Sequence, residues 1–451
     1  MGRLFGTDGV RGIANSELSC EYAMEIGRAA AAIIGDGGRG SPVFVVGRDT
    51  RASSDMLFSA LCAGICSVGA NVIDLGVIST PAVAYLIGKY KADAGVMISA
   101  SHNPANFNGI KIFNGNGYKL ADILEEKIEE TVLEKSNKPS LASAVSVGRI
   151  THAANAVKDY IRHIKSTVYN SLNGLNVALD CANGSASVSA KQLFEELGAN
   201  VHLLSSSPNG KNINENCGST NLSFLSKYVV DNSLDCGVAF DGDADRCLCV
   251  DERGNVIDGD MIMAICSLDL KKRGKLNNST VVGTIISNFG FTKFCEQNGL
   301  KFIPTKVGDR YVLEEMMLGD HSFGGEQSGH IIFRDFATTG DGQLTAAQLL
   351  SHMKAEKRSL SSLASVMTKY PQVSLNIPTT PEGKISFYTD RDIEDFIAKE
   401  KEALGKSGRI VVRPSGTEPL IRVMVEGEND SQIEKISRRI ENTIKEKLML
   451  K

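Results

Sequence analysis

The sequence lacks a strong net charge. Its 49 Lys and Arg residues nearly balance 53 Asp and Glu residues, which leaves a formal net charge of -4. A chain without a basic excess has no global field that attracts nucleic acid or an anionic membrane surface. We therefore expect no nucleic acid and no membrane among its partners, although a local basic loop could still bind a small anionic ligand.

Long apolar runs and a signal peptide are also missing. The apolar run at residues 29–34 follows Arg28 and is too short to span a bilayer. It is more typical of one face of a packed helix. The first residues are polar and rich in glycine, without the apolar core of a secretory signal. These absences predict a cytoplasmic protein.

The cysteines lack the spacing of a metal site or a disulfide framework. Among 10 cysteines, the only close pairs are Cys62 with Cys66 and Cys247 with Cys249, and each pair lies in an apolar run. Apolar surroundings and a reducing compartment favour buried free thiols over zinc ligands or disulfides.

A chain of 451 residues with 42% hydrophobic content can form three or four domains. Strand patterns alternate with helix patterns through most of the chain, which is typical of an α/β fold with largely parallel sheets. From about Tyr370 the strands instead look antiparallel and a charged helix follows them. The predicted domains are residues 1–150, 151–257, 258–369 and 370–451.

A small polar loop follows the predicted buried strand at residues 94–98. It contains Ser99, Ser101, His102 and Asn103 and ends at Pro104. Loops at the ends of buried strands often carry the reactive groups of α/β proteins. A plain Ser/Asn/Pro turn is the alternative reading.

Three aspartates, Asp241, Asp243 and Asp245, alternate with small residues after another predicted buried strand. Carboxylates at this spacing repel one another unless a cation neutralises them. Oxygen-only ligands suit a hard cation, and so few of them indicate Mg²⁺ with a substrate phosphate completing its shell. The loop lacks the glutamate of an EF-hand. A solvated acidic turn is the alternative.

Other loops offer groups for an anionic, hydroxyl-rich ligand. Arg11, in a glycine-rich turn, could hold a phosphate or be a solvated arginine. Lys111 lies in a short strand between predicted turns at Asn108-Gly109 and Asn114-Gly115, either as an edge-strand lysine or aimed at the Ser101 loop. Residues 323–330 combine glycines with groups that can bind sugar hydroxyls, and residues 413–419 with Arg422 could form a phosphate nest. Plain turns are the alternative for both loops.

Together and in this order, the loops around Ser101, Asp241, Glu326 and Ser415 closely resemble those of the α-D-phosphohexomutase superfamily over the whole chain. The resemblance implies three similar α/β domains with mixed, largely parallel sheets, and a C-terminal α+β domain, arranged around a central cleft. It also implies that Ser101 becomes phosphorylated and carries the phosphoryl group.

The same resemblance assigns roles to the other loop residues. Ser101, Asp241, Asp243 and Asp245 would hold Mg²⁺. Arg11, Lys111 and His330 would assist charge and proton handling beside Ser101, and the sequence does not decide which one moves the proton. The predicted substrate-binding residues are Arg246, Asp309, Glu326, Ser328, Arg413, Ser415, Gly416, Thr417 and Arg422.

Within the superfamily, residues 5–12, 325–330 and 413–419 are similar to members that interconvert glucosamine 6-phosphate and glucosamine 1-phosphate. Phosphomannomutase/phosphoglucomutase relatives typically carry Met at the position of Gln327. The implied path runs through a glucosamine (or glucose) 1,6-bisphosphate and supplies UDP-N-acetylglucosamine synthesis and peptidoglycan precursors. A mutase for glucose or mannose phosphates, a non-catalytic phosphosugar sensor and a metal-dependent phosphatase are the rivals. A homodimer is left open.

Overall fold

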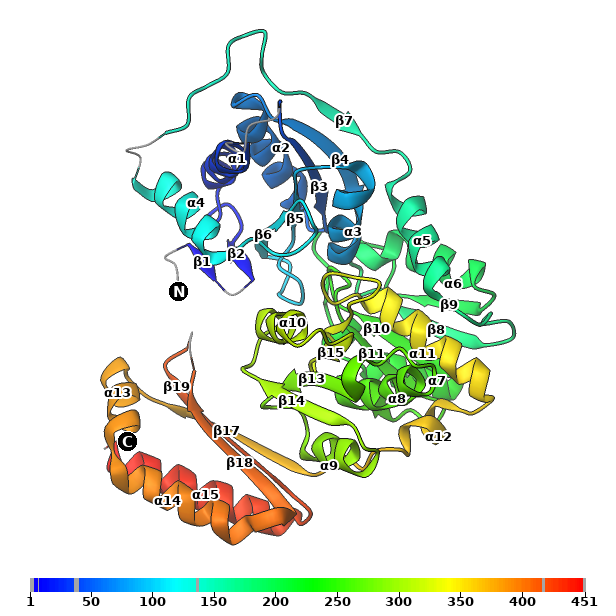
Figure 1. The fold of residues 1–451 in the computed structure, drawn as a ribbon, viewed down its shortest axis with the longest axis vertical. Helices are drawn as coiled ribbons and strands as arrows, with labels where there is room; N and C mark the ends of the chain where they lie inside the picture. Colours follow the sequence, from blue (N-terminus) through cyan, green and yellow to red (C-terminus); the bar gives the residue numbers. More distant parts are fainter. Residues whose placement is uncertain (1–3, 7, 36–39, 135–137, 416–417, 449–451) are drawn as a thin grey trace.

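The computed structural model describes residues 4–6, 8–35, 40–134, 138–415 and 418–448. In this part of the chain, four sheets follow one another in sequence order, and we call the segment built on each sheet a unit. The units lie along a curve, from the first, in blue, to the fourth, in orange and red (Figure 1). The predicted α/β class with largely parallel, mixed sheets is confirmed.

The first unit has a seven-stranded sheet in the order β1-β2-β6-β5-β3-β4-β7. Strands β3, β4, β5 and β7 are parallel, while β6 runs antiparallel between β5 and β2. Its elements are β1 (Phe5–Gly6), β2 (Gly9–Ile13), α1 (Cys20–Gly35), β3 (Val43–Arg48), α2 (Ser54–Ser67), β4 (Asn71–Val77), α3 (Thr80–Tyr90), β5 (Ala94–Ile98), β6 (Phe107–Asn114), α4 (Asp122–Glu134) and β7 (Ile150–His152).

The second and third units each have three parallel strands with antiparallel strands at one side. The second contains α5 (Ala156–Thr167), β8 (Asn176–Asp180), η1 (Ser185–Val188), α6 (Ala190–Glu196), β9 (Asn200–Leu204), η2 (Gly218–Thr220), α7 (Ser223–Asp231), β10 (Cys236–Phe240), β11 (Cys247–Asp251) and β12 (Val256–Ile257). The third contains α8 (Gly259–Lys272), η3 (Asn277–Ser279), β13 (Thr280–Thr284), α9 (Phe289–Gln297), β14 (Lys301–Thr305), α10 (Asp309–Leu318), β15 (Phe323–Gly325), β16 (Ile331–Phe333), α11 (Gly342–Glu356) and α12 (Leu360–Ala364).

The fourth unit is an antiparallel sheet, as predicted, and its strand order is β17-β19-β18. Its elements are β17 (Gln372–Pro378), α13 (Pro381–Thr389), α14 (Arg391–Leu404), η4 (Gly405–Ser407), β18 (Gly408–Pro414), β19 (Leu420–Gly427) and α15 (Asp430–Lys447). Helices α13 and α14 were not predicted. The buried apolar side chains of this unit form a core of their own, whereas one continuous core joins the first three units. The fourth unit is thus the one whose packing is most independent.

The domain limits stay predictions. The strand β7, which pairs with β4 in the first sheet, spans residues on both sides of the limit predicted after residue 150. The sequence pattern could not show this pairing, because all three residues of β7 are exposed and carry no apolar alternation.

The turn predicted at Asn108-Gly109 is wrong. Both residues lie inside β6, which is continuous from Phe107 to Asn114 and almost wholly buried. The side-chain amide of Asn108 donates hydrogen bonds to the hydroxyls of Ser53 and Ser54. Gly109 is required by close approach, because a Cβ there would lie 2.6 Å from the carbonyl oxygen of Ser99.

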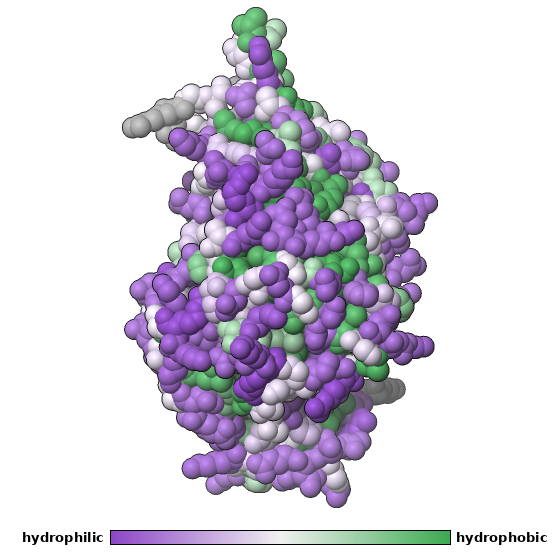
Figure 2. Space-filling model, turned by 90° about the vertical axis from the view of Figure 1, so that its right-hand side faces the viewer, coloured by the Kyte–Doolittle hydropathy of each residue, from purple (hydrophilic) through white to green (hydrophobic). Residues whose placement is uncertain are grey.

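Polar side chains predominate on the face drawn in Figure 2, and apolar residues appear there in separate groups. Among the described residues, no helix combines the length and the apolar character that crossing a membrane requires. All ten cysteines are free thiols and eight of them are buried, while Cys20 and Cys66 are partly exposed. The prediction of free thiols is confirmed.

The third and fourth units meet at a buried polar junction. Arg409 donates to the carbonyl oxygen of Ser287 (2.6 Å) and pairs with Glu426. Asn288 donates to Glu426 Oε1 (3.2 Å). Beneath it, Asp260 is fully buried; its Oδ2 accepts from the amide of Asn288 (2.7 Å), and its Oδ1 has no partner among the described residues. Burial, followed by the charge of Asp258, raises the pKa of Asp260 to about 8.

This shifted carboxyl predicts a pH-dependent stability. Between the usual aspartate pKa of 3.8 and about 8, the folded protein retains a proton that the unfolded chain releases, so stability falls as pH rises. Relative to Asp260→Asn, we expect the wild-type free energy of unfolding to fall by roughly 1 kcal/mol per pH unit across this window and to level off above it. Denaturant titrations from pH 5 to 9 measure the difference. Asp231→Asn, at an exposed position, is the control, and parallel wild-type and Asp260→Asn curves would contradict the assignment.

Candidate active site

The Ser101 loop follows β5, all five residues of which are buried. Ser101 is itself 1% exposed and has a φ of 50°, in the left-handed region that serine rarely adopts. Its hydroxyl donates to Asp241 Oδ2 at 2.5 Å and lies 3.4 Å from His102 Nδ1. The hydroxyl of Ser101 therefore points directly at the acidic loop of the second unit.

The acidic loop follows β10, which is parallel to β8 and fully buried. One oxygen from each of Asp241, Asp243 and Asp245 lies within 4.8 Å of the others, and all three residues are buried. The Oδ1 atoms of Asp243 and Asp245 are buried without a hydrogen-bond partner in the described part of the chain. Unpartnered carboxylate oxygens converging on one point fit a hard divalent cation. The alternative of a solvated acidic turn is excluded by this burial.

The charges of the triplet act on one another. Burial, with the like charges of Asp245 and Asp243, holds the pKa of Asp241 well above its usual range. Burial also favours a raised pKa at Asp245, but the charges of Lys111 and His330 hold the pKa of that carboxyl below its usual range. Of these two carboxyls, Asp241 is thus the one whose charged form its surroundings disfavour.

The structure decides between the two readings of Lys111. Strand β6 lies inside the sheet between β5 and β2, so Lys111 is not an edge-strand residue. Its side chain is 2% exposed, and Nζ lies 2.8 Å from Asp243, 3.0 Å from Asp8 and 3.6 Å from Asp245. Burial alone would lower the pKa of Lys111, but Asp243, Asp8 and Asp245 raise it well above its usual value. Lys111 is therefore a fixed cation beside the Ser101 loop.

Arg11 reaches the same region from β2. Its guanidinium pairs with Asp8 and lies 3.5 Å from Asn103 Oδ1. Asp8 also accepts from Lys119 (2.5 Å), which bridges to Asp309 of the third unit (2.5 Å). The cationic side chain of Arg246 lies 3.9 Å from Asp245, and its amide donates to Asp241 Oδ1 at 3.2 Å. Positively and negatively charged side chains therefore alternate where the first three units meet.

His330 stands between two carboxylates, with Nδ1 3.6 Å from Asp245 and Nε2 3.6 Å from Asp309. Burial alone lowers the pKa of His330, whereas Asp245, Asp309 and Glu326 raise it to about 9. The amide of Gly340, however, donates to Nε2 at 3.0 Å. Because a backbone N–H can only donate, this contact favours the neutral imidazole, in opposition to the carboxylates, which favour the protonated one. Lys111 is paired with carboxylates and Nε2 of His330 is already hydrogen-bonded, so neither is available as a base in this arrangement, and the proton acceptor stays undecided.

The predicted sugar loop lies between β15 and β16. Glu326 Oε1 accepts from the amide of Gly308 (3.1 Å), and burial raises the pKa of this carboxyl. The hydroxyl of Ser328 is buried and has no partner among the described residues. Both groups therefore have hydrogen-bonding capacity to offer a ligand.

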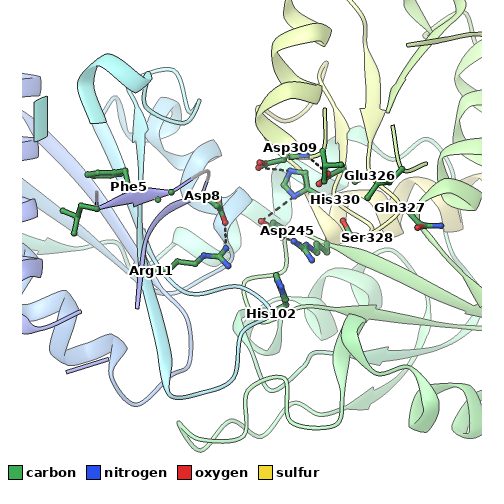
Figure 3. Close-up of a pocket in the computed structure, with 17 residues that line it drawn as sticks. Phe5, Asp8, Arg11, His102, Asp245, Asp309, Glu326, Gln327, Ser328 and His330 are labelled. Carbon is green, nitrogen blue, oxygen red and sulfur yellow. Dashed lines mark hydrogen bonds and ion pairs between the residues drawn. The ribbon is translucent and has the colours of Figure 1, made fainter. Parts of the chain in front are cut away.

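Several of these residues line a cavity of about 760 Å³: Asp8, Arg11, His102, Asp245, Arg246, Asp309, Glu326, Ser328 and His330. In Figure 3, Asp8 and Arg11 of the first unit lie on one side, Asp309, Glu326 and His330 of the third unit on the other, and His102 between them. Burial, followed by the charges of Arg246 and Arg11, lowers the pKa of His102 to about 4, so this imidazole is neutral near pH 7. Cations, neutral donors and carboxylates surround a space large enough for a phosphosugar.

The predicted phosphate loop lies at the end of the fourth unit, between β18 and β19 (Figure 1). Gly416 and Thr417 lie outside the described residues. Arg413 and Arg422 face each other in register, and burial together with the charge of Arg422 lowers the pKa of Arg413. Ser415 Oγ accepts from the amide of Glu418 at 3.2 Å. The described residues that line the 760 Å³ cavity all come from the first three units, so the roles of this loop stay predictions.

Four sequence-family models match this chain in order. They are described as phosphoglucomutase/phosphomannomutase alpha/beta/alpha domain I (residues 2–139), domain II (residues 158–254), domain III (residues 258–370) and the C-terminal domain (residues 375–443). The chain belongs to the phosphoglucomutase/phosphomannomutase family. The resemblance seen in the sequence is thereby confirmed at the level of the family and the fold.

Among curated members of this family, the phosphoglucosamine mutase of Caldanaerobacter subterraneus subsp. tengcongensis is 54% identical over 449 residues, covering 99% of this chain and 100% of the relative. That of Acetivibrio thermocellus is 50% identical over 448 residues, with the same coverage. A Burkholderia thailandensis family protein has a TM-score of 0.84 at 20% identity, covering 99% and 98% of the two chains. The Aspergillus fumigatus N-acetylphosphoglucosamine mutase, solved with GlcNAc-6P and magnesium, has a TM-score of 0.70 at 15% identity, covering 99% and 96%. These structures share the mutase fold.

Sequence reasoning missed several residues of this mutase-family site. Asp8 and Lys119 form the bridge between the first and third units, and Thr80 donates to Asp243 Oδ2 at 2.6 Å. Asp49 and Arg51 lie beneath the Ser101 loop. The signals were weak, because Asp8 only shares a glycine-rich segment with Arg11, and Asp49 and Arg51 only follow strand β3. Their partners are remote in sequence and could not be read from spacing.

Proposed function

We propose that this chain is a phosphoglucosamine mutase, which interconverts glucosamine 6-phosphate and glucosamine 1-phosphate. The observation that carries the proposal is the identity of 50 to 54% with curated phosphoglucosamine mutases over essentially the whole chain. The geometry supports it, because the buried hydroxyl of Ser101, the carboxylate triplet and the 760 Å³ cavity adjoin one another.

Ser101 is the proposed phosphoryl carrier. In the first step the bond between phosphorus and Ser101 Oγ breaks and a bond forms between phosphorus and the sugar oxygen O1 of glucosamine 6-phosphate, while O1 loses a proton and Ser101 Oγ gains one. The resulting glucosamine 1,6-bisphosphate reorients within the site. Its 6-phosphoryl group then returns to Ser101 Oγ, which leaves glucosamine 1-phosphate and restores the phosphoserine. A trace of glucosamine or glucose 1,6-bisphosphate would load Ser101 initially.

Fixed charges around Ser101 suit this transfer. Phosphoryl transfer depends mainly on positioning and on neutralising the charge of the phosphoryl oxygens. Lys111, Arg11 and Arg246 supply cations without moving, since each is held by a carboxylate of the site. The residues that would hold Mg²⁺ are Asp241, Asp243, Asp245 and Ser101, and the bound ion would add positive charge beside the phosphoryl oxygens.

Substrate recognition is divided between two loops in this proposal. Glu326 and Ser328 would bind sugar hydroxyls, with Asp309 and Arg246 beside them. Arg413, Ser415, Gly416, Thr417 and Arg422 would hold the phosphate that is not reacting. Since no described residue of this loop lines the 760 Å³ cavity, we propose that the fourth unit moves toward the first when substrate binds.

A substrate comparison tests the proposed function. In a Mg²⁺-dependent mutase assay primed with sugar 1,6-bisphosphate, we expect kcat/KM for glucosamine phosphate to exceed that for glucose and mannose phosphates by about a hundredfold. Equal or better use of glucose or mannose phosphates would overturn the assignment of the Glu326–His330 loop and favour a phosphomannomutase/phosphoglucomutase. Net release of phosphate instead of isomerisation would indicate a phosphatase.

The proposed activity places the enzyme before UDP-N-acetylglucosamine synthesis, and so among the enzymes that supply peptidoglycan precursors. The proposed location is the cytoplasm, where these phosphosugars occur. The phosphosugar is the expected partner, nucleic acid and membranes are not, and a homodimer stays a prediction.

A further inference from the structure

A buried guanidinium holds the loop that carries Ser101. We propose that Arg51 is a positioning residue: it fixes the carbonyl side of this loop so that Ser101 Oγ faces the carboxylate triplet. The inference rests on the proposed phosphoryl transfer and extends it to a residue that touches neither substrate nor the reacting atoms.

Every N–H donor of the Arg51 guanidinium has an acceptor, and its side chain is fully buried. Its Nε donates to Asp49 Oδ2 at 2.8 Å. The other four contacts are with carbonyl oxygens of the Ser101 loop and its exit: Nη2 donates to Ser101 (3.0 Å) and Asn103 (2.8 Å), and Nη1 donates to Phe107 (3.0 Å) and Pro104. Only the planar fork of an arginine can make this set of contacts from one side chain.

The amide of Ser101 is linked to the ion pair of Asp49 and Arg51 through the hydroxyl of Ser99. The amide of Ser101 donates to Ser99 Oγ (3.0 Å), and Ser99 Oγ donates to Asp49 Oδ2 (2.6 Å). Thus Asp49 and Arg51 hold both the amide and the carbonyl of a serine in the left-handed region. Such a conformation persists only where the surroundings determine it from several directions.

The second unit adds a third residue to this arrangement, and we call the contacts of Asp49, Arg51 and Asn214 with the backbone of the Ser101 loop the clamp. Asn214 Nδ2 donates to the carbonyl oxygens of Ser101 (2.9 Å) and Asn103 (3.1 Å). Gly242 of the acidic loop packs so closely that a Cβ there would lie 2.5 Å from the carbonyl oxygen of Ser101. The carbonyl of Ser101 is therefore fixed from two units, and this sets the 2.5 Å approach of its hydroxyl to Asp241.

The clamp matters most when Ser101 is phosphorylated. A phosphoserine brings a dianion next to three carboxylates, and any repulsion that the cations of the site leave unbalanced favours movement of the loop away from the acidic residues. A displacement of the reacting oxygen by about 1 Å can lower a rate about 100-fold. Arg51 opposes this displacement because it holds four carbonyl groups along the loop.

Arg51→Lys tests the inference, with Arg48→Lys as the matched control. Arg48 is the last residue of β3, three residues before Arg51, and its guanidinium pairs with Asp55 (2.6 Å) and Asp74 (2.7 Å) instead of the Ser101 loop. In Arg51→Lys we expect kcat to fall about 100-fold while KM changes less than about threefold, because positioning and not binding is lost. Arg48→Lys should retain wild-type kcat. Equal kcat in the two variants would overturn the inference.

Asn214→Asp provides a second test. Aspartate has nearly the size of asparagine and, like asparagine, can adopt the positive φ of 59° found at this position. The substitution removes the two amide donors from the same carbonyl groups, so kcat should again fall with little change in KM. Wild-type kcat in this variant would show that the carbonyl clamp is not needed.

Hydrogen exchange separates this inference from the proposed function. The amides of Asn103 and Phe107, bonded within the loop, should exchange at least about tenfold faster in Arg51→Lys than in Arg48→Lys. If the wild-type protein isomerises no phosphosugar, the proposed function fails, and unchanged exchange of these two amides would then overturn the positioning role independently.

Discussion

Replacing Ser101 by alanine is expected to lower kcat by at least about 10⁴-fold, because the variant has no oxygen to carry the phosphoryl group. Binding should persist, since the residues that line the 760 Å³ cavity remain in place. Mutase assays measure the first effect, and calorimetric titration with glucosamine 6-phosphate measures the second. Intact-mass analysis after incubation with sugar 1,6-bisphosphate should show phosphorylation of the wild-type chain and none at this site in the variant.

Ser185→Ala is the matched control for Ser101→Ala. Ser185 is also buried, at the first residue of η1 after the small-residue loop that follows the parallel strand β8, and its hydroxyl has no partner among the described residues. It should keep wild-type activity within a factor of about two to three. Substantial turnover in Ser101→Ala would remove Ser101 from the role of carrier, whatever the substrate proves to be.

Asp241→Asn is expected to have opposite effects on activity and on metal-free stability. Burial and the charges of Asp245 and Asp243 raise the pKa of Asp241, so a neutral amide should relieve repulsion in the metal-free protein and raise its Tm by a few degrees. Loss of one carboxylate ligand should abolish most of the stabilisation by Mg²⁺ and lower kcat/KM by about 10²–10³-fold. Thermal unfolding with EDTA and with Mg²⁺, together with mutase assays, measures these effects.

Asp180→Asn is the control for this prediction. Asp180 ends the neighbouring strand β8, is equally buried, and accepts from the amides of Ala182 (2.9 Å) and Gly218 (2.9 Å). It lies outside the triplet, so its variant should retain the stabilisation by Mg²⁺. A full response to Mg²⁺ in Asp241→Asn would place the cation elsewhere.

Local chemistry allowed much of the site to be predicted. Three aspartates at alternate positions after an apolar strand indicated a cation site, and they do converge within 4.8 Å. The Ser101 loop could be found because small polar residues end a strand of five apolar or small residues. Both signals lie within a few residues of sequence, where residue type and spacing are sufficient.

Other parts depended on contacts between remote segments. The Asn108-Gly109 pair was expected to be a turn, but pairing with β5 and β2 on both sides keeps it extended within β6. That same pairing makes Lys111 an interior residue and directs it to Asp243. A dipeptide preference for turns is weaker than the hydrogen bonds of two neighbouring strands, and sequence order does not reveal which strands become neighbours.

The sequence by itself determined the kinds of groups in this protein: a loop serine, an acidic triplet, glycine-rich loops with sugar-binding groups, and arginines in the fourth unit. Only the tertiary structure decided which of them meet. It set Ser101 against Asp241, connected Asp8 to Asp309 through Lys119, and placed Arg51 beneath the Ser101 loop. The reason is physical: composition and short-range spacing fix local chemistry, whereas sheet order and the packing of separate units fix distances between segments that lie up to 221 residues apart in the chain.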